Sequence, residues 1–355
     1  MRILHIITSL RVGGAERLMV DLLPRLSDMG NEVELLLFDG IRTPFYSQLE
    51  LAGIKLHYLS INRNVYHPVN LIKLFCFIRK NRFDIVHTHN AAPQLFAAIV
   101  GRFFHMALCT TEHNTNNRRR NLRWYASIDR WMYRQYKRII CITDKVKDNL
   151  ESHIGSSQNL FVINNGIDCQ RFYGCIKDVR GKCRYVLAMV GSFSVQKDQD
   201  SIIRALSVLP PCYELRLIGD GPRREELEKL AIKLNVRDRV SFLGIRDDVP
   251  QQLKHADVVV HSSHWEGFGL AAVEGMAAGI PVIVSDVPGL ADIVRNYGIV
   301  VPAGDHYAVK EAILKLTGDA GYYQEVASRC QERAMQFDIG RMAEKYNNLY
   351  KNLDR

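Results

Sequence analysis

The chain has 355 residues, of which 47% are hydrophobic and 24% are charged, and its formal net charge is +9. A chain of this length usually divides into two domains, and the composition is that of an ordinary globular protein. No run of eighteen uninterrupted apolar residues occurs, which argues against a transmembrane helix. The positive charge favours an anionic membrane, nucleic acid or a phosphorylated small molecule as partner, and it does not choose among them.

Two features bear on the compartment in which the chain works. The first ten residues form a short apolar run without a distinct basic region or a small-residue cleavage site, so we predict a buried first strand and no signal peptide. Eight cysteines are scattered without a C-x-x-C pair, and several lie in apolar, strand-like runs. We therefore predict buried thiols in a reducing compartment, and neither a disulfide framework nor a zinc site.

The first half of the chain alternates short apolar runs with amphipathic segments. Residues 2–8 are predicted to form a strand, and residues 13–30 a glycine turn followed by a helix that ends at Gly30. Further strands are predicted at 32–38, 83–89, 107–113 and 138–143. This alternation of strands and helices predicts a parallel sheet covered on both faces.

The alternation is interrupted at residues 161–184, a loop-like stretch rich in asparagine, glycine and charge. It resumes with strands predicted at 185–193, 213–221, 239–244, 256–263 and 281–286. We therefore predict two α/β domains with their boundary near residues 174–184. The N-terminal domain is placed at 1–175, the C-terminal domain at 184–335, and a last helix at 336–355. The sequence does not specify where that helix packs, and the N-terminal domain is one of the surfaces open to it.

The loops that follow strands carry the candidate sites, because ligands of doubly wound sheets bind beyond the carboxyl ends of the strands. After the strand predicted at 256–263, Glu266 lies in a loop and Glu274 lies a turn and a half inside the next helix. Each can accept hydrogen bonds from different hydroxyls of one extended ligand. Free N–H groups near Phe268 and Gly269, where that helix begins, suit a phosphate. The alternative is a helix N-terminal carboxylate followed by a solvated glutamate.

Several short motifs follow one another along nearly the whole chain. They are GGAER (13–17), HTHN (87–90), TEHN (111–114), NNGID (164–168), GSFSVQKD (191–198), GDGPRREELEKLA (219–231) and EGFG (266–269), the last of which begins an E-x7-E spacing. This ordered set resembles the retaining glycosyltransferases of family 4, which include bacterial capsule, O-antigen and mannosyl transferases. The resemblance implies the GT-B fold, an α/β architecture of two tandem Rossmann-like, doubly wound parallel-sheet domains that face a cleft.

The resemblance implies that the C-terminal domain binds a nucleotide-diphosphate sugar. Glu266 is expected to lie against the donor sugar and Glu274 to bind the ribose. Lys197 is expected to bind the diphosphate and to stabilise the negative charge that develops on it. The start of the helix after Glu266 would also contact the phosphates. Ser192 departs from the family pattern, which has an arginine there, so one fixed positive charge is missing.

In the N-terminal domain, the resemblance implies that Gly13 and Gly14 form a loop whose backbone approaches the donor phosphate and the acceptor. A plain strand-to-helix turn is the alternative, and the lack of a third glycine disfavours an NAD enzyme. His113 matches a histidine that contacts the donor sugar region. It is therefore assigned to the catalytic site together with Glu266 and Lys197.

No metal ion and no other cofactor are expected. His87 and His89 are candidates to bind the acceptor, and with His113 they could form a metal site, but no carboxylate or cysteine has ligand spacing beside them. Asp198 and Asp200 form an Asp-x-Asp pair, which holds a divalent metal in a different glycosyltransferase fold. Because this pair begins a helix, we interpret both as first-turn carboxylates that complement the helix dipole.

Residues 116–138 contain eight lysines or arginines, one acidic residue and five aromatic residues. Basic residues mixed with aromatics are typical of a segment at an anionic membrane surface. Nucleic acid binding, or an amphipathic helix whose aromatics pack on the sheet, would fit the same pattern. We expect a cytoplasmic protein that attaches peripherally to the inner face of the cell membrane, with no nucleic acid partner.

The motifs together predict a retaining glycosyltransferase of bacterial surface glycan synthesis. It would move a sugar from a nucleotide-diphosphate sugar, with UDP weakly preferred, to a lipid-linked, oligosaccharide or polysaccharide acceptor. A nucleotide-sugar 2-epimerase of the same architecture would also need the donor carboxylates. A non-catalytic scaffold subunit at the membrane is a third possibility. A nucleic-acid-binding protein is the least favoured, because the glutamate pair would then be unused.

Overall fold

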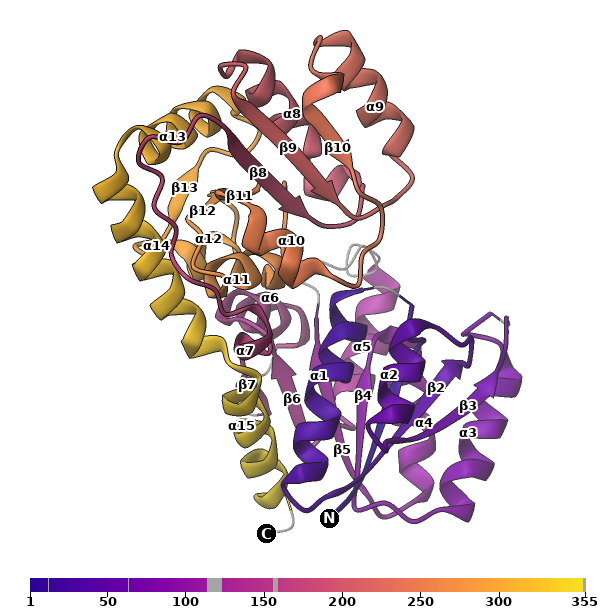
Figure 1. The fold of residues 1–355 in the computed structure, drawn as a ribbon. Helices are drawn as coiled ribbons and strands as arrows, with labels where there is room; N and C mark the ends of the chain where they lie inside the picture. The colour runs from indigo at the N-terminus through magenta and orange to yellow at the C-terminus, as the bar shows by residue number, and fades with distance from the viewer. Residues whose placement is uncertain (12, 63, 114–122, 156–158, 354–355) are drawn as a thin grey trace. The chain divides into compact units, whose positions relative to one another are not determined.

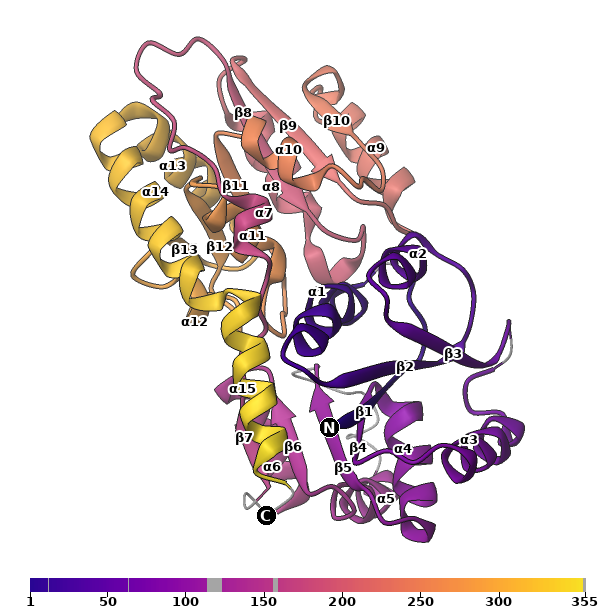
Figure 2. The same ribbon diagram turned by 60° about the horizontal axis from the view of Figure 1, so that its bottom comes forward.

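The structure is a computed structural model that describes residues 1–11, 13–62, 64–113, 123–155 and 159–353. The chain forms two compact units (Figures 1 and 2). The first unit contains residues 1–166 and 339–355, and the second unit contains residues 167–338.

The first unit is built on a seven-stranded, all-parallel sheet with the strand order β3-β2-β1-β4-β5-β6-β7. The strands are β1 (Arg2–Ile7), β2 (Glu32–Asp39), β3 (Lys55–Ser60), β4 (Ile85–His89), β5 (Ala107–Glu112), β6 (Arg138–Cys141) and β7 (Leu160–Val162). The chain runs outward from β1 to β3 and returns to the other side of β1 with β4. The strand order therefore reverses between β1 and β4, which is where doubly wound sheets bind their ligands.

Helices cover both faces of this sheet, with α1 and α2 on one face and α3 and α4 on the other (Figure 2). They are α1 (Gly14–Asp28), α2 (Pro44–Leu51), α3 (Pro68–Lys80), α4 (Ala91–Val100), the short 3₁₀ helix η1 (Gly101–Phe103), α5 (Arg123–Tyr133), α6 (Asp144–Ile154) and α15 (Ile339–Lys351). Local sequence sets the ends of α6: Thr143 accepts a hydrogen bond from the Val146 N–H, and Gly155 ends the helix in the left-handed conformation.

The second unit is built on a six-stranded, all-parallel sheet with the strand order β10-β9-β8-β11-β12-β13. The strands are β8 (Tyr185–Val190), β9 (Tyr213–Ile218), β10 (Val240–Phe242), β11 (Val258–His261), β12 (Val282–Ser285) and β13 (Ile299–Val301). This sheet repeats the winding of the first, and its strand order reverses between β8 and β11. The predicted fold, two doubly wound parallel-sheet domains, is confirmed.

The helices of the second unit connect these strands and end with a long pair, α13 and α14. They are α7 (Cys169–Phe172), η3 (Val195–Lys197), α8 (Gln199–Val208), α9 (Arg224–Lys233), η4 (Arg237–Arg239), α10 (Val249–His255), α11 (Leu270–Ala277), α12 (Ala291–Val294), α13 (His306–Gly318), α14 (Ala320–Ala334) and η5 (Met335–Phe337). In the described part of the chain, no helix combines the length and the apolar character needed to cross a membrane.

The boundary between the units lies earlier than the predicted 174–184. Residues from Ile167 onward belong to the second unit, because Ile167 forms a β-bridge with Asp338 and the Cys169 thiol lies 3.4 Å from the carbonyl oxygen of Ala334. The chain then returns at residue 339. Helix α15, yellow in Figure 1, packs against α1 and belongs to the first unit.

Three strands of the sheets were not predicted from the sequence: β3, β7 and β13. Each lies at an edge of its sheet. In β3 polar residues interrupt the apolar run, and β7 and β13 have only three residues each, too few for a strand pattern to show. The loop-like stretch predicted at 161–184 accordingly begins inside β7 and includes helix α7.

The prediction that the cysteines are buried is right for only half of them. Cys109, Cys141, Cys169 and Cys330 are buried, and burial raises the pKa of the Cys109 and Cys330 thiols to about 12. The other four are partly or fully exposed: Cys76, Cys175, Cys183 and Cys212. Cys76 lies on the solvent side of α3 and Cys183 in the segment before β8, where the sequence pattern did not reveal exposure. The eight cysteines all lie among the described residues, and none of them forms a disulfide bond.

Candidate functional site

In the second unit, the loops after β8 and β11 meet at the carboxyl edge of the sheet, because these neighbouring strands flank the reversal of strand order. Lys197 lies in the first of these loops and Glu266 in the second. The Lys197 ammonium and the Glu266 carboxylate form an ion pair in which both side chains are mostly buried. The structure thus brings together two residues predicted for the donor site. Their roles toward a diphosphate and a sugar stay predictions.

Backbone contacts hold these two loops together. The His264 N–H donates to the carbonyl oxygen of Gln196 at 2.8 Å, and the Gln196 side-chain amide donates to the carbonyl oxygen of Trp265 at 3.0 Å. The residues that flank Lys197 and Glu266 are therefore fixed to each other independently of the ion pair. A ligand that drew Lys197 away from Glu266 would leave the loops connected.

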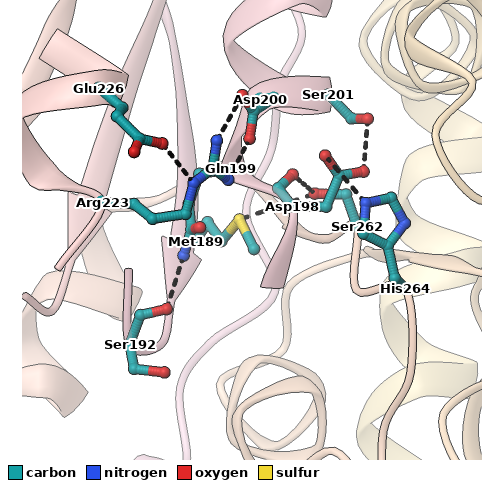
Figure 3. A network of polar contacts seen from close by, with 10 residues as sticks. All are labelled: Met189, Ser192, Asp198, Gln199, Asp200, Ser201, Arg223, Glu226, Ser262 and His264. Atoms are coloured by element: carbon teal, nitrogen blue, oxygen red, sulfur yellow. Dashed lines mark hydrogen bonds and ion pairs between the residues drawn. The ribbon is translucent and has the colours of Figure 1, made fainter. Parts of the chain in front are cut away.

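Asp198 was predicted in the first turn of a helix. It lies instead immediately before α8. Its backbone is left-handed, with φ +49°, because it joins η3 to α8. Its buried carboxylate accepts a hydrogen bond from the Ser201 hydroxyl at 2.6 Å, and its carbonyl oxygen accepts one from Ser262 at 2.6 Å (Figure 3). His264 Nε2 lies 3.8 Å from the carboxylate. Burial raises the pKa of Asp198, and the bond from Ser201 opposes that shift.

Asp200 does lie in the first turn of α8, as predicted, and it is neutralised by an arginine. Arg223 donates to its two carboxylate oxygens at 2.6 and 3.0 Å and also pairs with Glu226 (Figure 3). Among the residues that the structure describes, no group of three or more histidine, cysteine or acidic side chains is arranged to hold a metal ion. Both acids of the Asp-x-Asp pair are thus engaged with protein partners.

Ser192 is exposed in the loop after β8, and its carbonyl oxygen accepts a hydrogen bond from the Gln199 amide at 2.9 Å (Figure 3). Arg223 belongs to the same part of the second unit, but two carboxylates already balance its charge. Arg223 is therefore a poor substitute for the arginine that is missing at position 192.

Helix α11 begins at Leu270, with Gly269 as its N-cap. Gly269 has φ +89°, and a Cβ there would lie 2.5 Å from Leu290 Cδ1, so this position requires glycine. The Phe268 side chain is buried edge-on against Phe337, so a ligand could contact Phe268 only through its backbone. Glu274 lies in the second turn of α11 and is partly exposed. The predicted roles of Phe268, Gly269 and Glu274 stay predictions.

In the first unit, the glycine turn precedes α1 at the reversal between β1 and β4. Gly14 is the first residue of α1, and Gly13 is its N-cap with an extended backbone. A Cβ on Gly13 would overlap the carboxylate of Glu16, so a larger residue there would require the Glu16 side chain to shift. The predicted contact of Gly13 and Gly14 with a phosphate stays a prediction.

A cavity of about 360 Å³ lies beside this turn, and its lining includes Ser9, Glu16, Tyr66 and Asn90. The Asn90 amide donates to the Glu16 carboxylate; burial raises the pKa of Glu16, and hydrogen bonds from its own backbone and from Asn90 oppose the shift. Asn90 has φ +69° and ψ +158°, a region that is strained for any residue but glycine by about 1–3 kcal/mol. Neither Glu16 nor Asn90 was predicted as a site residue, although they lie in the motifs GGAER and HTHN.

The histidines at the carboxyl ends of β4 and β5 differ in exposure. His87 and His89 are fully buried, so the suggestion that they bind the acceptor is wrong. His113 follows β5 and is partly exposed, and its Nε2 lies 3.0 Å from His89 Nδ1. Burial lowers the pKa of His113 to about 4, so the ring is neutral near pH 7. Its contact with a donor sugar stays a prediction.

The basic, aromatic segment 116–138 falls partly outside the described residues, which exclude 114–122 and with them Arg118, Arg119 and Arg120. In the described part, Arg130, Arg134 and Lys137 are exposed. Tyr133 and Tyr136 are buried instead, and their hydroxyls donate to Glu112 at 2.6 Å and to the carbonyl oxygen of Gln94 at 2.7 Å. These two aromatics therefore belong to the core of the first unit and do not face a membrane.

Comparisons with known proteins match each unit to a family. Residues 12–171 match the model described as Glycosyltransferase Family 4, and residues 177–337 match the model described as Glycosyl transferases group 1. One relative is UDP-Gal:alpha-D-GlcNAc-diphosphoundecaprenol alpha-1,3-galactosyltransferase of Escherichia coli, 26% identical over 79% of this chain and 78% of its own. Another is N-acetyl-alpha-D-glucosaminyl L-malate synthase of Bacillus anthracis, 24% identical over 96% of this chain and 94% of its own.

The fold has a near match among solved structures. HepE of Anabaena, crystallised with UDP-glucose, superposes with a TM-score of 0.87 at 23% identity, over 99% of this chain and 100% of its own. The chain therefore belongs to the GT-B glycosyltransferases, with a family 4 first unit and a group 1 second unit.

Proposed function

We propose that this glycosyltransferase moves a sugar from UDP to a lipid-linked acceptor in bacterial surface glycan synthesis, with retention of anomeric configuration. One observation carries the proposal: Lys197 and Glu266 are in contact at the carboxyl edge of the second sheet. A lysine can neutralise the charge on a leaving diphosphate, and a carboxylate can accept hydrogen bonds from sugar hydroxyls. The pair combines both chemical needs of a nucleotide-sugar donor.

The names of similar proteins support the choice of donor and acceptor. The Escherichia coli relative is named for a UDP-Gal donor and a diphosphoundecaprenol-linked acceptor. Anabaena HepE was crystallised with UDP and with UDP-glucose. Both point to a uridine donor for this chain, and the first points to an acceptor carried on a polyprenyl diphosphate.

The proposed reaction needs no covalent enzyme intermediate. The acceptor hydroxyl attacks the anomeric carbon from the side on which UDP departs, the bond from that carbon to the diphosphate breaks, and the hydroxyl proton passes to a phosphate oxygen. Lys197 and the N–H groups at the start of α11 stabilise the departing charge. Glu266 and His113 orient the sugar, and Glu274 holds the ribose.

The proposal is tested by incubating the protein with a panel of nucleotide sugars and measuring the nucleotide released, with and without a membrane lipid extract. We expect UDP release from one UDP-sugar that depends on the extract, and a product whose NMR coupling shows the configuration of the donor. Conversion of the nucleotide sugar to an isomer without an acceptor would support the 2-epimerase instead. No turnover with any donor would favour the scaffold.

Replacement of Glu274 by alanine is expected to weaken UDP binding about ten- to a hundredfold, because a hydrogen bond between a charged and a neutral group contributes about 1.5–3 kcal/mol. Isothermal titration calorimetry with UDP measures the change. Glu225→Ala, on the exposed face of α9, is the matched control and should leave the affinity unchanged. Equal affinity in the wild type and Glu274→Ala would remove Glu274 from the donor site.

We propose that transfer is independent of metal, because Ser201 engages Asp198 and Arg223 neutralises Asp200. Activity is expected to survive EDTA. Asp198→Asn should retain most of the activity, because asparagine also tolerates the left-handed backbone of this position. The initial rate before and after dialysis against EDTA measures the effect. A loss on chelation that manganese or magnesium restores would show that the Asp-x-Asp pair holds a metal.

We also propose that the protein attaches reversibly to an anionic membrane surface through residues 116–138. Each basic residue close to such a surface contributes roughly 1 kcal/mol, and this attraction weakens with salt. Sedimentation with liposomes that contain anionic lipid should therefore show binding at low salt and release at high salt. Arg118→Ser, Arg119→Ser and Arg120→Ser together should reduce the bound fraction without changing UDP affinity.

The matched control removes three exposed positive charges from the second unit: Arg180, Arg184 and Lys229. We expect this control to bind liposomes nearly as well as the wild type. If the wild type stays in the supernatant at low salt, the segment does not bind membranes and a water-soluble acceptor becomes the better choice.

A further inference from the structure

A continuous chain of hydrogen bonds runs through the core of the first unit and ends at His113. In order, its members are Tyr346, Thr111, His87, Tyr350, His5, His89 and His113, and the successive contacts measure 2.9, 2.8, 2.6, 3.5, 3.1 and 3.0 Å. We call it the histidine chain. All members except His113 are fully buried. The two tyrosines come from α15, so the C-terminal helix reaches the candidate catalytic histidine through side chains on β1, β4 and β5.

The four imidazole rings of the histidine chain are neutral near pH 7. Burial lowers the pKa of His5 to about 3 and that of His113 to about 4, and it lowers the pKa of His87 and His89 well below the usual value. A neutral imidazole has one N–H donor and one nitrogen acceptor. Each ring must therefore donate to one neighbour and accept from the other, so the direction of one hydrogen bond sets the direction of the next.

The inner end of the histidine chain determines this direction. Thr111 Oγ1 is the one acceptor that the described residues place within reach of the Tyr346 hydroxyl, so Tyr346 donates to Thr111. The Thr111 hydroxyl then donates to His87 Nε2, and His87 Nδ1–H donates to Tyr350. In this arrangement the buried donors of Tyr346, Thr111 and His87 each have an acceptor.

The same direction continues to the surface. Because the Tyr350 oxygen accepts from His87, its hydroxyl is left to donate to His5 Nε2. His5 Nδ1–H then donates to His89 Nε2, and His89 Nδ1–H donates to His113 Nε2. His113 consequently carries its proton on Nδ1. The opposite direction would leave a hydroxyl of Tyr346 or Thr111 buried without an acceptor, which disfavours it at least about fivefold.

We propose that α15, acting through the histidine chain, holds His113 in the Nδ1–H tautomer, so that His113 presents a hydrogen-bond donor to the sugar substrate. The Nε2–H tautomer is the intrinsically preferred form of a neutral histidine side chain. The histidine chain therefore reverses that preference at His113. Tyr350, His5 and His89 are then positioning residues. The consequence for catalysis rests on the proposed function, whereas the tautomer itself does not.

The tautomer is measured by nitrogen-15 NMR of the full chain labelled on histidine, since the chemical shift separates protonated from unprotonated ring nitrogens. The spectrum of His113→Asn identifies the His113 signals by their absence. We expect the wild type to carry the proton on Nδ1. A proton on Nε2 of His113 in the wild type would by itself overturn the proposal.

Two variants that each remove one buried hydroxyl from α15 make a matched pair. Tyr350→Phe breaks the contact between His87 and His5, so His113 should shift toward the Nε2–H tautomer. The loss of one neutral hydrogen bond should lower kcat/KM for sugar transfer roughly two- to tenfold. Tyr346→Phe leaves the Thr111 hydroxyl to donate to His87, so the direction of the chain is kept. It should leave the tautomer unchanged and kcat/KM within about twofold.

The tautomers decide between the proposal and a purely structural role for the tyrosines. The same His113 tautomer in the wild type and in folded Tyr350→Phe would overturn the proposal. If Tyr350→Phe does not fold, the wild-type spectrum still decides. A tautomer shift in a protein that transfers no sugar would support the histidine chain and count against the proposed function alone.

Discussion

Replacement of Lys197 by alanine is expected to lower the turnover number about 100- to 1000-fold, the loss seen when a group that stabilises developing charge is removed from an active site. Lys197 contacts Glu266. Under the proposed function, its removal takes away a positive charge that would stabilise the departing diphosphate. The second unit should stay folded, because backbone contacts between the loops remain. Initial rates of UDP release at saturating donor measure the effect.

Lys229→Ala is the matched control for this experiment. Lys229 lies on the exposed face of α9 in the same unit and pairs only loosely with Glu225, at 3.9 Å. Its removal changes the net charge equally and should leave the turnover number unchanged. If Lys197→Ala turned over and bound UDP as well as the control does, the assignment of the donor site to these loops would be wrong.

Replacement of Asp257 by alanine is expected to lower the free energy of unfolding by about 3 kcal/mol. Asp257 is fully buried immediately before β11. Its carboxylate accepts hydrogen bonds from Lys177, from Lys182 and, at 2.8 Å, from the Val186 N–H. Removal would leave that N–H without its partner and take away the carboxylate that holds Lys182, while Lys177 would keep its hydrogen bond to the carbonyl oxygen of Ala256 at 2.6 Å. Urea unfolding followed by circular dichroism measures the change.

Asp178→Ala is the control, because Asp178 lies in the same segment and pairs with Arg180 on the surface. Solvent and salt screen such pairs, so the unfolding midpoint should hardly change. If the two variants unfold at the same urea concentration, the buried carboxylate does not anchor the segment before β8.

Much of the fold was predictable from the order of the central strands. β1, β8 and β11 are mostly buried, so each contains an apolar run that the sequence reveals. The edge strands β3, β7 and β13 were not predicted: polar residues interrupt the apolar pattern of β3, and β7 and β13 have only three residues each. The boundary was placed too late for a related reason: α7 has four residues, too few for a helical period to show.

The candidate site was predictable where residues follow strands. Glu266 was singled out in a loop that follows a strand, and Lys197 was assigned from the family resemblance of its loop; the strand order brings the two loops together. Glu16 and Asn90 were missed because their contact joins the loops after β1 and β4, and neither residue is unusual in its own motif. Asp198 was wrongly placed in the first turn of a helix. It adopts a left-handed backbone between two helical segments, and the only sign of this in the sequence is that aspartate tolerates that conformation.

Apolar periodicity and glycine turns are local properties of the chain, so the alternation of strands and helices that builds both sheets could be predicted from the sequence. The sequence also determined which loops carry charged residues beyond the strands. The tertiary fold was needed to show that α15 joins the first unit, that Tyr350 contacts His87 and His5, and that Tyr346 contacts Thr111, each more than 200 residues earlier. Such contacts depend on which apolar face covers which part of the core, and nothing in a local pattern specifies that partner.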